Sequence, residues 1–328
     1  MIDTHGRTAT NFRISVIDRC NLRCSYCIQS DEGIAWLEKG KLLTFPEILR
    51  ITQLVAELGV DQLRITGGEP LVRPGVCGLI SKLRMIDGID RISMTTNGVL
   101  LNKYLTDLET AGLSSLNISL DTLNETKFKK ITSKNHFGKV IDSIKNARRT
   151  SIRVKVNTVA IKGFNDNEIL DFVDFAINND LTLRFIEFMP FAGNAWNSNN
   201  VISAQKIRQI VGRRYKLFPE PLDHPSQTSR IYQLDGTSAK IGFIASVTES
   251  FCKWCNRLRL TADGNLRTCL HSFNETPLRD LLRNGVSDLD LKKNIVNAVR
   301  LKQKEHVNFL DPNFLPIEDD REMIRIGG

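Results

Sequence analysis

Three cysteines near the N-terminus, Cys20, Cys24 and Cys27, stand in a C-x3-C-x2-C spacing directly after the apolar run 12–17. Three thiolates carried by one short loop are soft ligands that suit iron. An iron–sulfur cubane has four irons, so three cysteines leave one iron free for a small molecule, much as catalytic metal sites keep one position open. The alternatives are a structural zinc site and a disulfide framework, and this spacing by itself leaves both open.

A second set of three cysteines, Cys252, Cys255 and Cys269, stands near the C-terminus in a C-x2-C-x13-C spacing. Because His271 is close by, this set taken alone favours a zinc site of the Cys3His type. With the first set present in the same chain, a second iron–sulfur cluster with one open iron becomes the better interpretation.

The composition is that of an ordinary globular protein, with 41% hydrophobic and 25% charged residues among 328. A formal charge of +8 is compatible with nucleic acid, a membrane surface or a polyanionic small molecule as partner. The basic residues are dispersed, which disfavours a nucleic-acid groove. Because the chain lacks a long apolar span and a signal or transit pattern, we expect a cytoplasmic protein. In that compartment clustered cysteines bind metal more often than they form disulfides.

Between residues 12 and 189 short β-like runs alternate with helical patterns, about one pair every thirty residues. Right-handed crossovers between parallel strands then give an α/β fold, either an open doubly wound sheet or a barrel. The predicted strands are 12–17, 62–67, 91–96, 115–120, 153–160 and 182–189.

Alternation along these strands separates an apolar face from a polar and basic one, as where Arg13 opposes Ile14. Polar side chains buried without partners cost free energy, so the polar face is predicted to line a wet cavity or a charged ligand's site. A partial, six-stranded (βα) barrel with an unfilled interior fits this pattern. The strand 182–189 fits less well, because Arg184 and Met189 have opposite parity and would need a bulge to face inward together.

The chemistry of such folds sits at the carboxyl ends of the strands. The first cysteine set follows the first predicted strand, and Gly67-Gly68-Glu69-Pro70 follows the second. Glycines are also the usual residues of a plain strand-to-helix turn, which this stretch alone would favour. The candidate groups are therefore expected to converge on one rim.

These stretches together resemble the signature of the radical S-adenosylmethionine (SAM) enzymes, in which a Gly-Gly-Glu-Pro element meets the methionine end of SAM. The stretch 251–270 and the terminal Gly327-Gly328 narrow the resemblance to the GTP 3′,8-cyclase family, lyases that carry out the first step of molybdenum cofactor biosynthesis. The similarity runs from about Phe12 to the last residue. It implies two 4Fe-4S clusters and conversion of GTP to (8S)-3′,8-cyclo-7,8-dihydroguanosine 5′-triphosphate through a 5′-deoxyadenosyl radical derived from SAM.

The resemblance also implies residue roles, position by position. The first cluster is held by Cys20, Cys24 and Cys27, and the second by Cys252, Cys255 and Cys269. The implied SAM contacts are Tyr26, Gly68, Ser119 and Met189. The implied GTP contacts are Arg13, Arg64, Thr95, Lys155, Arg184, Arg257 and Arg259. The implied catalytic residues are Arg257, Arg259, Gly327 and Gly328. Ordinary packing is the alternative for Tyr26 and Met189, and a frayed end is the alternative for the two glycines.

The expected organisation is a radical SAM core at 4–225 and a C-terminal domain at 226–328 that closes the barrel mouth. The expected partners are GTP, an electron donor and, as a candidate, the next enzyme of the pathway, cyclic pyranopterin monophosphate synthase. Neither nucleic acid nor membrane is expected, and the chain is expected to be a monomer or homodimer. Two rival functions are a radical SAM peptide maturase with an auxiliary cluster and a zinc-dependent nucleic-acid-binding module.

Overall fold

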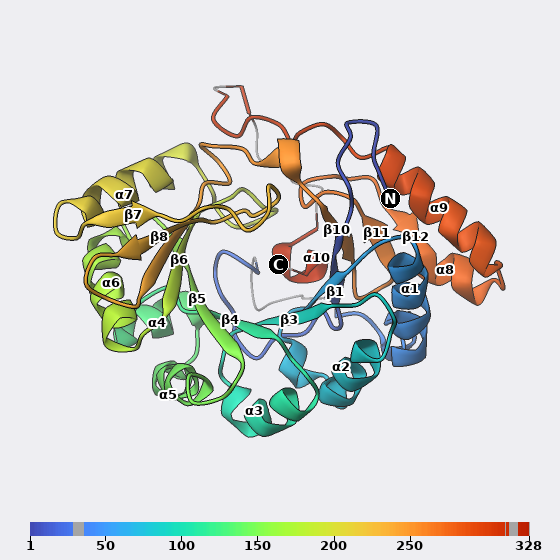
Figure 1. Ribbon diagram of the computed structural model, residues 1–328, viewed down its shortest axis with the longest axis horizontal. Coiled ribbons are helices and arrows are strands. Elements are labelled where there is room, and N and C mark those ends of the chain that lie inside the picture. The colour runs from blue at the N-terminus through green and yellow to red at the C-terminus, as the bar shows by residue number, and fades with distance from the viewer. Residues whose placement is uncertain (29–35, 312, 315–320, 328) are drawn as a thin grey trace.

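The computed structural model describes residues 1–28, 36–311, 313–314 and 321–327. Within this part, the strands form one twelve-stranded sheet in the order β12-β11-β10-β1-β2-β3-β4-β5-β6-β9-β8-β7. All pairings from β10 to β9 along this order are parallel. The sheet curves around a central space without closing, and helices cover its outer side (Figure 1). The fold is an α/β partial barrel, which confirms the prediction.

The six predicted strands are all present, and their ends differ from the prediction by at most two residues. Their bounds are β1 Asn11–Ser15, β2 Gln62–Thr66, β3 Arg91–Thr96, β4 Ser115–Ser119, β5 Arg153–Ala160 and β6 Thr182–Glu187. A bulge, which Arg184 and Met189 would need if both faced inward from one strand, is not required. Because β6 already ends at Glu187, Met189 lies in the following loop and reaches the interior without any irregularity in the strand.

The helices follow the strands and are amphipathic, so each buries one apolar face against the sheet. Thr44 caps the first of them in a capping box with Glu47. Their bounds are α1 Phe45–Glu57, α2 Val76–Arg84, α3 Leu101–Thr110, α4 Glu125–Thr132, α5 Phe137–Ala147, α6 Ile169–Asn178 and α7 Ala204–Gly212.

The C-terminal part extends the sheet at both edges, because β9 pairs with β6 and β10 pairs with β1. The four-residue helix α10 lies in the central space enclosed by the sheet (Figure 1). The remaining bounds are β7 Leu217–Pro219, β8 Arg230–Leu234, β9 Lys240–Ile244, β10 Arg257–Leu260, β11 Asn265–Arg267, β12 Thr276–Pro277, α8 Leu278–Arg283, α9 Asp288–Arg300 and α10 Met323–Ile326.

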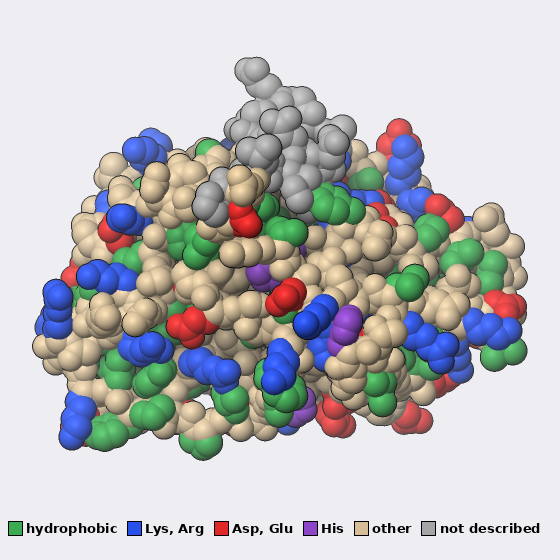
Figure 2. All heavy atoms as spheres, turned by 90° about the horizontal axis from the view of Figure 1, so that it is seen from above, with side chains coloured by type: hydrophobic (Ala, Val, Ile, Leu, Met, Phe, Trp, Pro, Cys, Tyr) green, Lys and Arg blue, Asp and Glu red, His purple; other side chains and the backbone are tan. Residues whose placement is uncertain are grey.

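The outer surface carries charge of both signs. On the face shown in Figure 2, Lys and Arg side chains are scattered among Asp and Glu rather than gathered in one stripe. This distribution agrees with the dispersed charge of the sequence. In the described ranges, no helix combines the length and the apolar character needed to cross a bilayer.

Candidate active site

Two cavities of about 1060 Å³ each open at the carboxyl ends of the parallel strands. We call them the first-cysteine cavity, lined by Cys20, Cys24 and Cys27, and the second-cysteine cavity, lined by the other trio. Thr95 and Met323 line both, so the two cavities adjoin. The two sets of cysteines, which are more than two hundred residues apart in the sequence, therefore face one shared interior.

The first cysteine loop is fixed to the end of α4. The backbone N–H of Arg23 donates to the Thr132 carbonyl at 2.9 Å, and that of Ser25 donates to the Ile131 carbonyl at 3.0 Å. Burial raises the pKa of the Cys20 thiol to about 11 and that of Cys27 still further. Thiols in such surroundings ionise only when a cation compensates their charge, so the loop suits a bound metal centre.

The Gly67-Gly68 stretch is more than a plain turn. The Gly68 N–H donates to the Ile17 carbonyl at 2.7 Å, and the Glu69 N–H donates to the Arg19 carbonyl at 2.9 Å. A Cβ at Gly68 would lie 2.3 Å from the Arg19 carbonyl oxygen, which no side chain tolerates. The glycine thus allows the loop after β2 to pack directly on the chain that leads to the first cysteine set.

Glu69 holds the loop after β3 in place. Its carboxylate accepts hydrogen bonds from the Thr96 hydroxyl at 2.8 Å and from the Asn97 backbone N–H at 2.7 Å. The Asn97 side chain in turn donates to the Cys20 sulfur at 3.5 Å. Burial nevertheless raises the pKa of Glu69 to about 7. Protonation of this carboxyl group is therefore coupled to folding near neutral pH.

We expect the metal-free protein to lose stability as the pH rises because of Glu69. The proton that the folded chain keeps on this carboxyl stabilises fully below pH 4.5, its ordinary pKa, and is lost as the pH rises through about 7. The free energy of unfolding, measured in urea, should be lower at pH 8 than at pH 5 by up to about 3 kcal/mol because of Glu69. Glu69→Gln should remove this dependence, whereas Glu125→Gln on the exposed start of α4 should keep it. Parallel pH profiles for wild type and Glu69→Gln would contradict the linkage.

The predicted SAM contacts do not all lie in one cavity. Tyr26, Gly68 and Ser119 line the first-cysteine cavity, whereas Met189 lines the second. The Tyr26 hydroxyl donates to Asp121 Oδ2 at 2.5 Å, and burial raises the pKa of Asp121 to about 6. The sequence placed Asp121 at the end of a strand but gave it no role.

The second cysteine set lies beside cations. The Arg257 guanidinium donates to the Cys255 sulfur at 3.3 Å. Although burial opposes ionisation, the charges of Arg257 and Lys302 bring the pKa of Cys255 down to about 6. Among the described residues, no three His, Cys, Asp or Glu side chains are close enough to share a single metal ion. In a cubane each cysteine binds a different iron, so sulfurs that line one cavity without meeting at a point fit a cluster.

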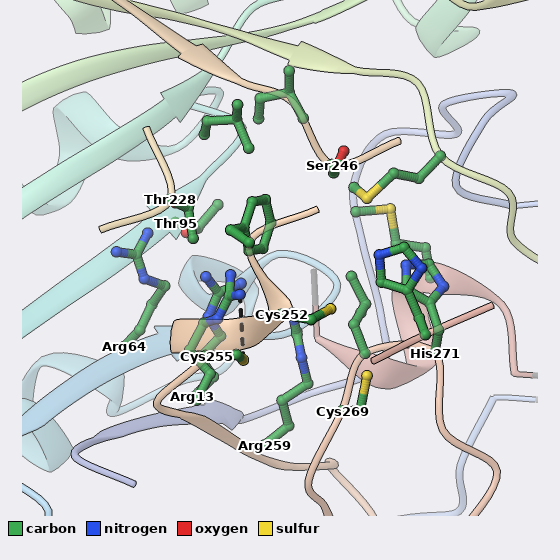
Figure 3. Close-up of a pocket in the computed structure, with 18 of the residues that line it drawn as sticks. Arg13, Arg64, Thr95, Thr228, Ser246, Cys252, Cys255, Arg259, Cys269 and His271 are labelled. Atoms are coloured by element: carbon green, nitrogen blue, oxygen red, sulfur yellow. Dashed lines mark hydrogen bonds between the residues drawn. The ribbon is translucent and has the colours of Figure 1, made fainter. Parts of the chain in front are cut away.

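The second-cysteine cavity is strongly basic (Figure 3). None of its lining residues in the described part is an Asp or Glu, while five are arginines, namely Arg13, Arg64, Arg184, Arg257 and Arg259. Within the part of the chain that the structure describes, the buried Nε atoms of Arg13 and Arg64 have no hydrogen-bond partner. Burial, and then the neighbouring guanidinium groups, hold the pKa of Arg13 well below its ordinary value. Uncompensated cations and unpaired donors of this kind call for a polyanion.

The two further GTP candidates lie at the edges of this cavity. Thr95 stands between the two cysteine cavities. Lys155 lines an outer cavity of about 1240 Å³ that shares Arg13, Arg64 and Arg184 with the second-cysteine cavity. Arg184 points inward, and its Nε donates to Asn157 Oδ1 at 2.9 Å. The cations thus extend from the second cysteine set to the outer opening.

The C-terminal tail enters the barrel instead of fraying. Ile324 and Ile326 are buried, and the Gly327 carbonyl accepts a hydrogen bond from Arg259 Nη1 at 2.7 Å. Gly327 packs against Ser15 and Thr66, at the ends of β1 and β2. Gly328, the other predicted tail residue, lies outside the described residues.

Several residues at the site went unrecognised in the sequence. Asn157 and Met323 line both cysteine cavities, and Lys302 contacts Cys255. Asn157 carried a usable signal, since it occupies the polar face of β5 beside Lys155. Met323 and Lys302 lie in segments without periodicity and carried none.

Two family models match the chain. The first, the Radical SAM superfamily, matches residues 14–176, and the second, Molybdenum Cofactor Synthesis C, matches residues 181–308. The solved structure of SuiB from Streptococcus suis bound to S-adenosylmethionine has a TM-score of 0.62, with 14% identity over 88% of this chain and 68% of that one. At this identity the likeness shows the fold alone.

Named relatives are similar over nearly the whole chain. "Molybdenum cofactor biosynthesis protein 1" of Drosophila melanogaster is 43% identical over 94% of this chain and 54% of its own length. The chain thus spans about half the length of that relative. "GTP 3′,8-cyclase" of Peptoclostridium acidaminophilum is 40% identical over 100% of this chain and 98% of its own length. With its radical SAM fold and this full-length similarity, the chain belongs to the GTP 3′,8-cyclase family.

Proposed function

We propose that the protein is a radical SAM lyase that converts GTP to (8S)-3′,8-cyclo-7,8-dihydroguanosine 5′-triphosphate, the first step of molybdenum cofactor biosynthesis. The observation that carries this proposal is the second-cysteine cavity, where five arginines and no carboxylate among the described residues surround a trio of cysteines. A nucleoside triphosphate has the charge for such a cavity and a heterocycle that an open iron can bind. The family membership of the chain supports the same substrate.

The first-cysteine cavity would hold the first cluster and SAM. Cys20, Cys24 and Cys27 provide the ligands, and Tyr26, Gly68 and Ser119 lie beside them for contact with SAM. When bound, cluster and SAM supply a carbon radical that removes the 3′ hydrogen of the ribose. Met189, in the adjoining cavity, would contact SAM from the side of the substrate. Thr95 lines both cavities and would orient the ribose between them.

The basic cavity would hold GTP. Arginines offer planar forks that suit phosphate, and Lys155 adds a point charge at the outer opening. Cys252, Cys255 and Cys269 would hold the second cluster, whose open iron would offer a binding site that positions the guanine of GTP. Such positioning can lower a barrier by roughly 7 kcal/mol or more. Arg257, Arg259, Gly327 and Gly328 would complete the reacting end of the cavity, with Arg259 held by the Gly327 carbonyl.

The two rival functions lack this support. A peptide substrate does not require five inward arginines, and zinc sites need ligands that meet at one ion.

The proposed division assigns the first cluster to a core at 4–225 and the second cluster to a C-terminal part at 226–328. Strands of both parts belong to one sheet. An electron donor, the next enzyme of the pathway as a partner, a cytoplasmic location and a monomeric or dimeric state remain expectations.

An anaerobic assay tests the function. The reconstituted protein, given SAM and a reductant, should form 5′-deoxyadenosine when GTP is present and not when ATP or a peptide replaces it. Iron and sulfide analysis should give about eight irons per chain. Cys24→Ser should lose about half of this iron and all activity, whereas Cys77→Ser, on α2 outside both sets, should keep both. Product formation only with a peptide, or zinc without sulfide, would reject the proposal.

A further inference from the structure

The segment 302–306 follows α9 and lies against the second cysteine set. It brings a hydrogen-bond donor to two of the three sulfurs and a histidine near the third. Lys302 Nζ lies 3.5 Å from Cys255 Sγ, and Gln303 Nε2 lies 3.6 Å from Cys269 Sγ. The His306 side chain lies near Cys252. One short stretch of chain therefore contacts every proposed ligand of the second cluster.

Lys302 is the unusual member, because its ammonium group is buried. The residue is 4% exposed, and Nζ also donates to the carbonyls of Cys255 and Arg257, both at 2.9 Å. No salt bridge joins it to a carboxylate within the described ranges. A buried cation needs a negative partner, and the cysteine sulfurs are the groups in contact that can provide it.

Arg7 fixes the segment in place. Its Nη2 donates to the Gln303 carbonyl at 2.7 Å, and its Nη1 donates to the Lys304 carbonyl at 2.7 Å and to the Cys252 carbonyl at 2.9 Å. Asp3 holds the guanidinium from the other side at 2.6 Å. This buried clamp ties the segment directly to the cysteine loop, so the donors keep their positions at the sulfurs.

The surroundings of the first cysteine set differ in charge. Its donors to sulfur, the Leu22 backbone N–H and the Asn97 amide, are neutral and both contact Cys20. Arg23 is a cation near Cys20, but carboxylates act on the other two cysteines. These carboxylates belong to Asp121, beside Cys24, and Glu322, near Cys27. Reduction adds one electron to a cluster, and nearby positive charge and hydrogen bonds to sulfur stabilise the added charge. Carboxylates have the opposite effect.

We propose that the segment 302–306 raises the reduction potential of the second cluster above that of the first. Its donors make the second cluster the easier one to reduce. The inference rests on the proposed function, because it requires a cluster at each cysteine set. Lys302 acts through the cluster and is therefore a positioning residue. The electron that reduces the cluster comes from the reductant of the assay.

A redox titration of the holoenzyme tests this role. Dithionite is added stepwise in the presence of mediators, the reduced clusters are followed by electron paramagnetic resonance, and Cys24→Ser assigns the signal of the second cluster. At the potential where the second cluster of the wild type is half reduced, the ratio of its oxidised to its reduced form is one. In Lys302→Met this ratio should be roughly ten or more, which corresponds to a midpoint potential lower by about 59 mV. The first cluster should be unaffected. Lys302→Arg should retain the wild-type value.

Lys304→Met provides the matched control, since it removes the same charge from an exposed position of the same segment. Gln303→Leu removes a neutral donor and should shift the ratio about threefold in the same direction. Equal shifts for Lys302→Met and Lys304→Met would overturn the inference. Loss of iron in both Lys302→Met and Gln303→Leu would overturn it too, because the segment would then retain the cluster without tuning it. Normal GTP turnover with unshifted potentials would reject only this role, whereas shifted potentials without GTP turnover would reject only the proposed function.

Discussion

Removal of Gly327 and Gly328 is expected to lower turnover of GTP by roughly two orders of magnitude or more, with both clusters still in place. The reason lies in the contact between the Gly327 carbonyl and Arg259 Nη1, which are 2.7 Å apart inside the barrel. Without this acceptor, the buried guanidinium has more freedom beside four other arginines that repel it. A misplacement of about 1 Å at a reacting centre is enough for a loss of this size.

The measurement is 5′-deoxyadenosine formed with GTP, together with the iron content of the same sample. Gly327→Ala is the more conservative variant, because the added Cβ would lie 2.6 Å from the Thr66 hydroxyl and the backbone φ is 77°. Gly138→Ala is the matched control, as it has open space around the new methyl group. Unchanged turnover in the truncated chain would refute the role of the tail, and loss of iron would mean that the tail supports the fold.

Arg13→Met should stabilise the protein without substrate and weaken its binding of GTP. Arg13 is a partly buried cation among Arg64, Arg257 and Arg259, and its buried Nε has no hydrogen-bond partner among the described residues. Removing it relieves repulsion and desolvation, so the melting temperature of the substrate-free protein should rise by about 2–4 °C. The lost phosphate contact should weaken GTP binding by about 10- to 100-fold.

Thermal unfolding and equilibrium binding of GTP, measured on the same preparation, check that the melting temperature rises while the affinity for GTP falls. Lys139→Met on the exposed face of α5 removes one positive charge far from the cavity and should change neither quantity. A lower melting temperature for Arg13→Met would mean that the folded protein already compensates this charge. Unaltered GTP affinity would remove Arg13 from the substrate contacts.

The sequence predicted the barrel well because its strands carry a local signal. Five of the six alternate apolar and polar residues, and this pattern decides which face meets the helices. The same alternation predicts that Arg13, Arg64 and Lys155 lie on the inner face of the sheet. These three cations line the cavities as predicted, and a local rule was sufficient to find them.

Contacts between distant segments could not be predicted in this way. The pairing of β10 with β1 joins residues about 250 positions apart, and no local pattern specifies it. Lys302 approaches Cys255 from a segment that Arg7, about 300 positions earlier, helps to hold in place. The end of the sixth strand was misjudged for a different reason: parity fixes a side chain's direction only within a strand, and β6 ends two residues before Met189.

The partnership of the first strand with β10 has a consequence during synthesis. A ribosome that adds roughly 5–20 residues per second completes β10 some 10–50 s after β1 has been made. Throughout that interval β1 presents one unpaired edge of backbone donors and acceptors, which is the kind of surface that recruits other nascent chains. The barrel of this protein therefore depends on protection of its earliest strand, and chaperone supply should limit its yield more than the stability of the finished fold does.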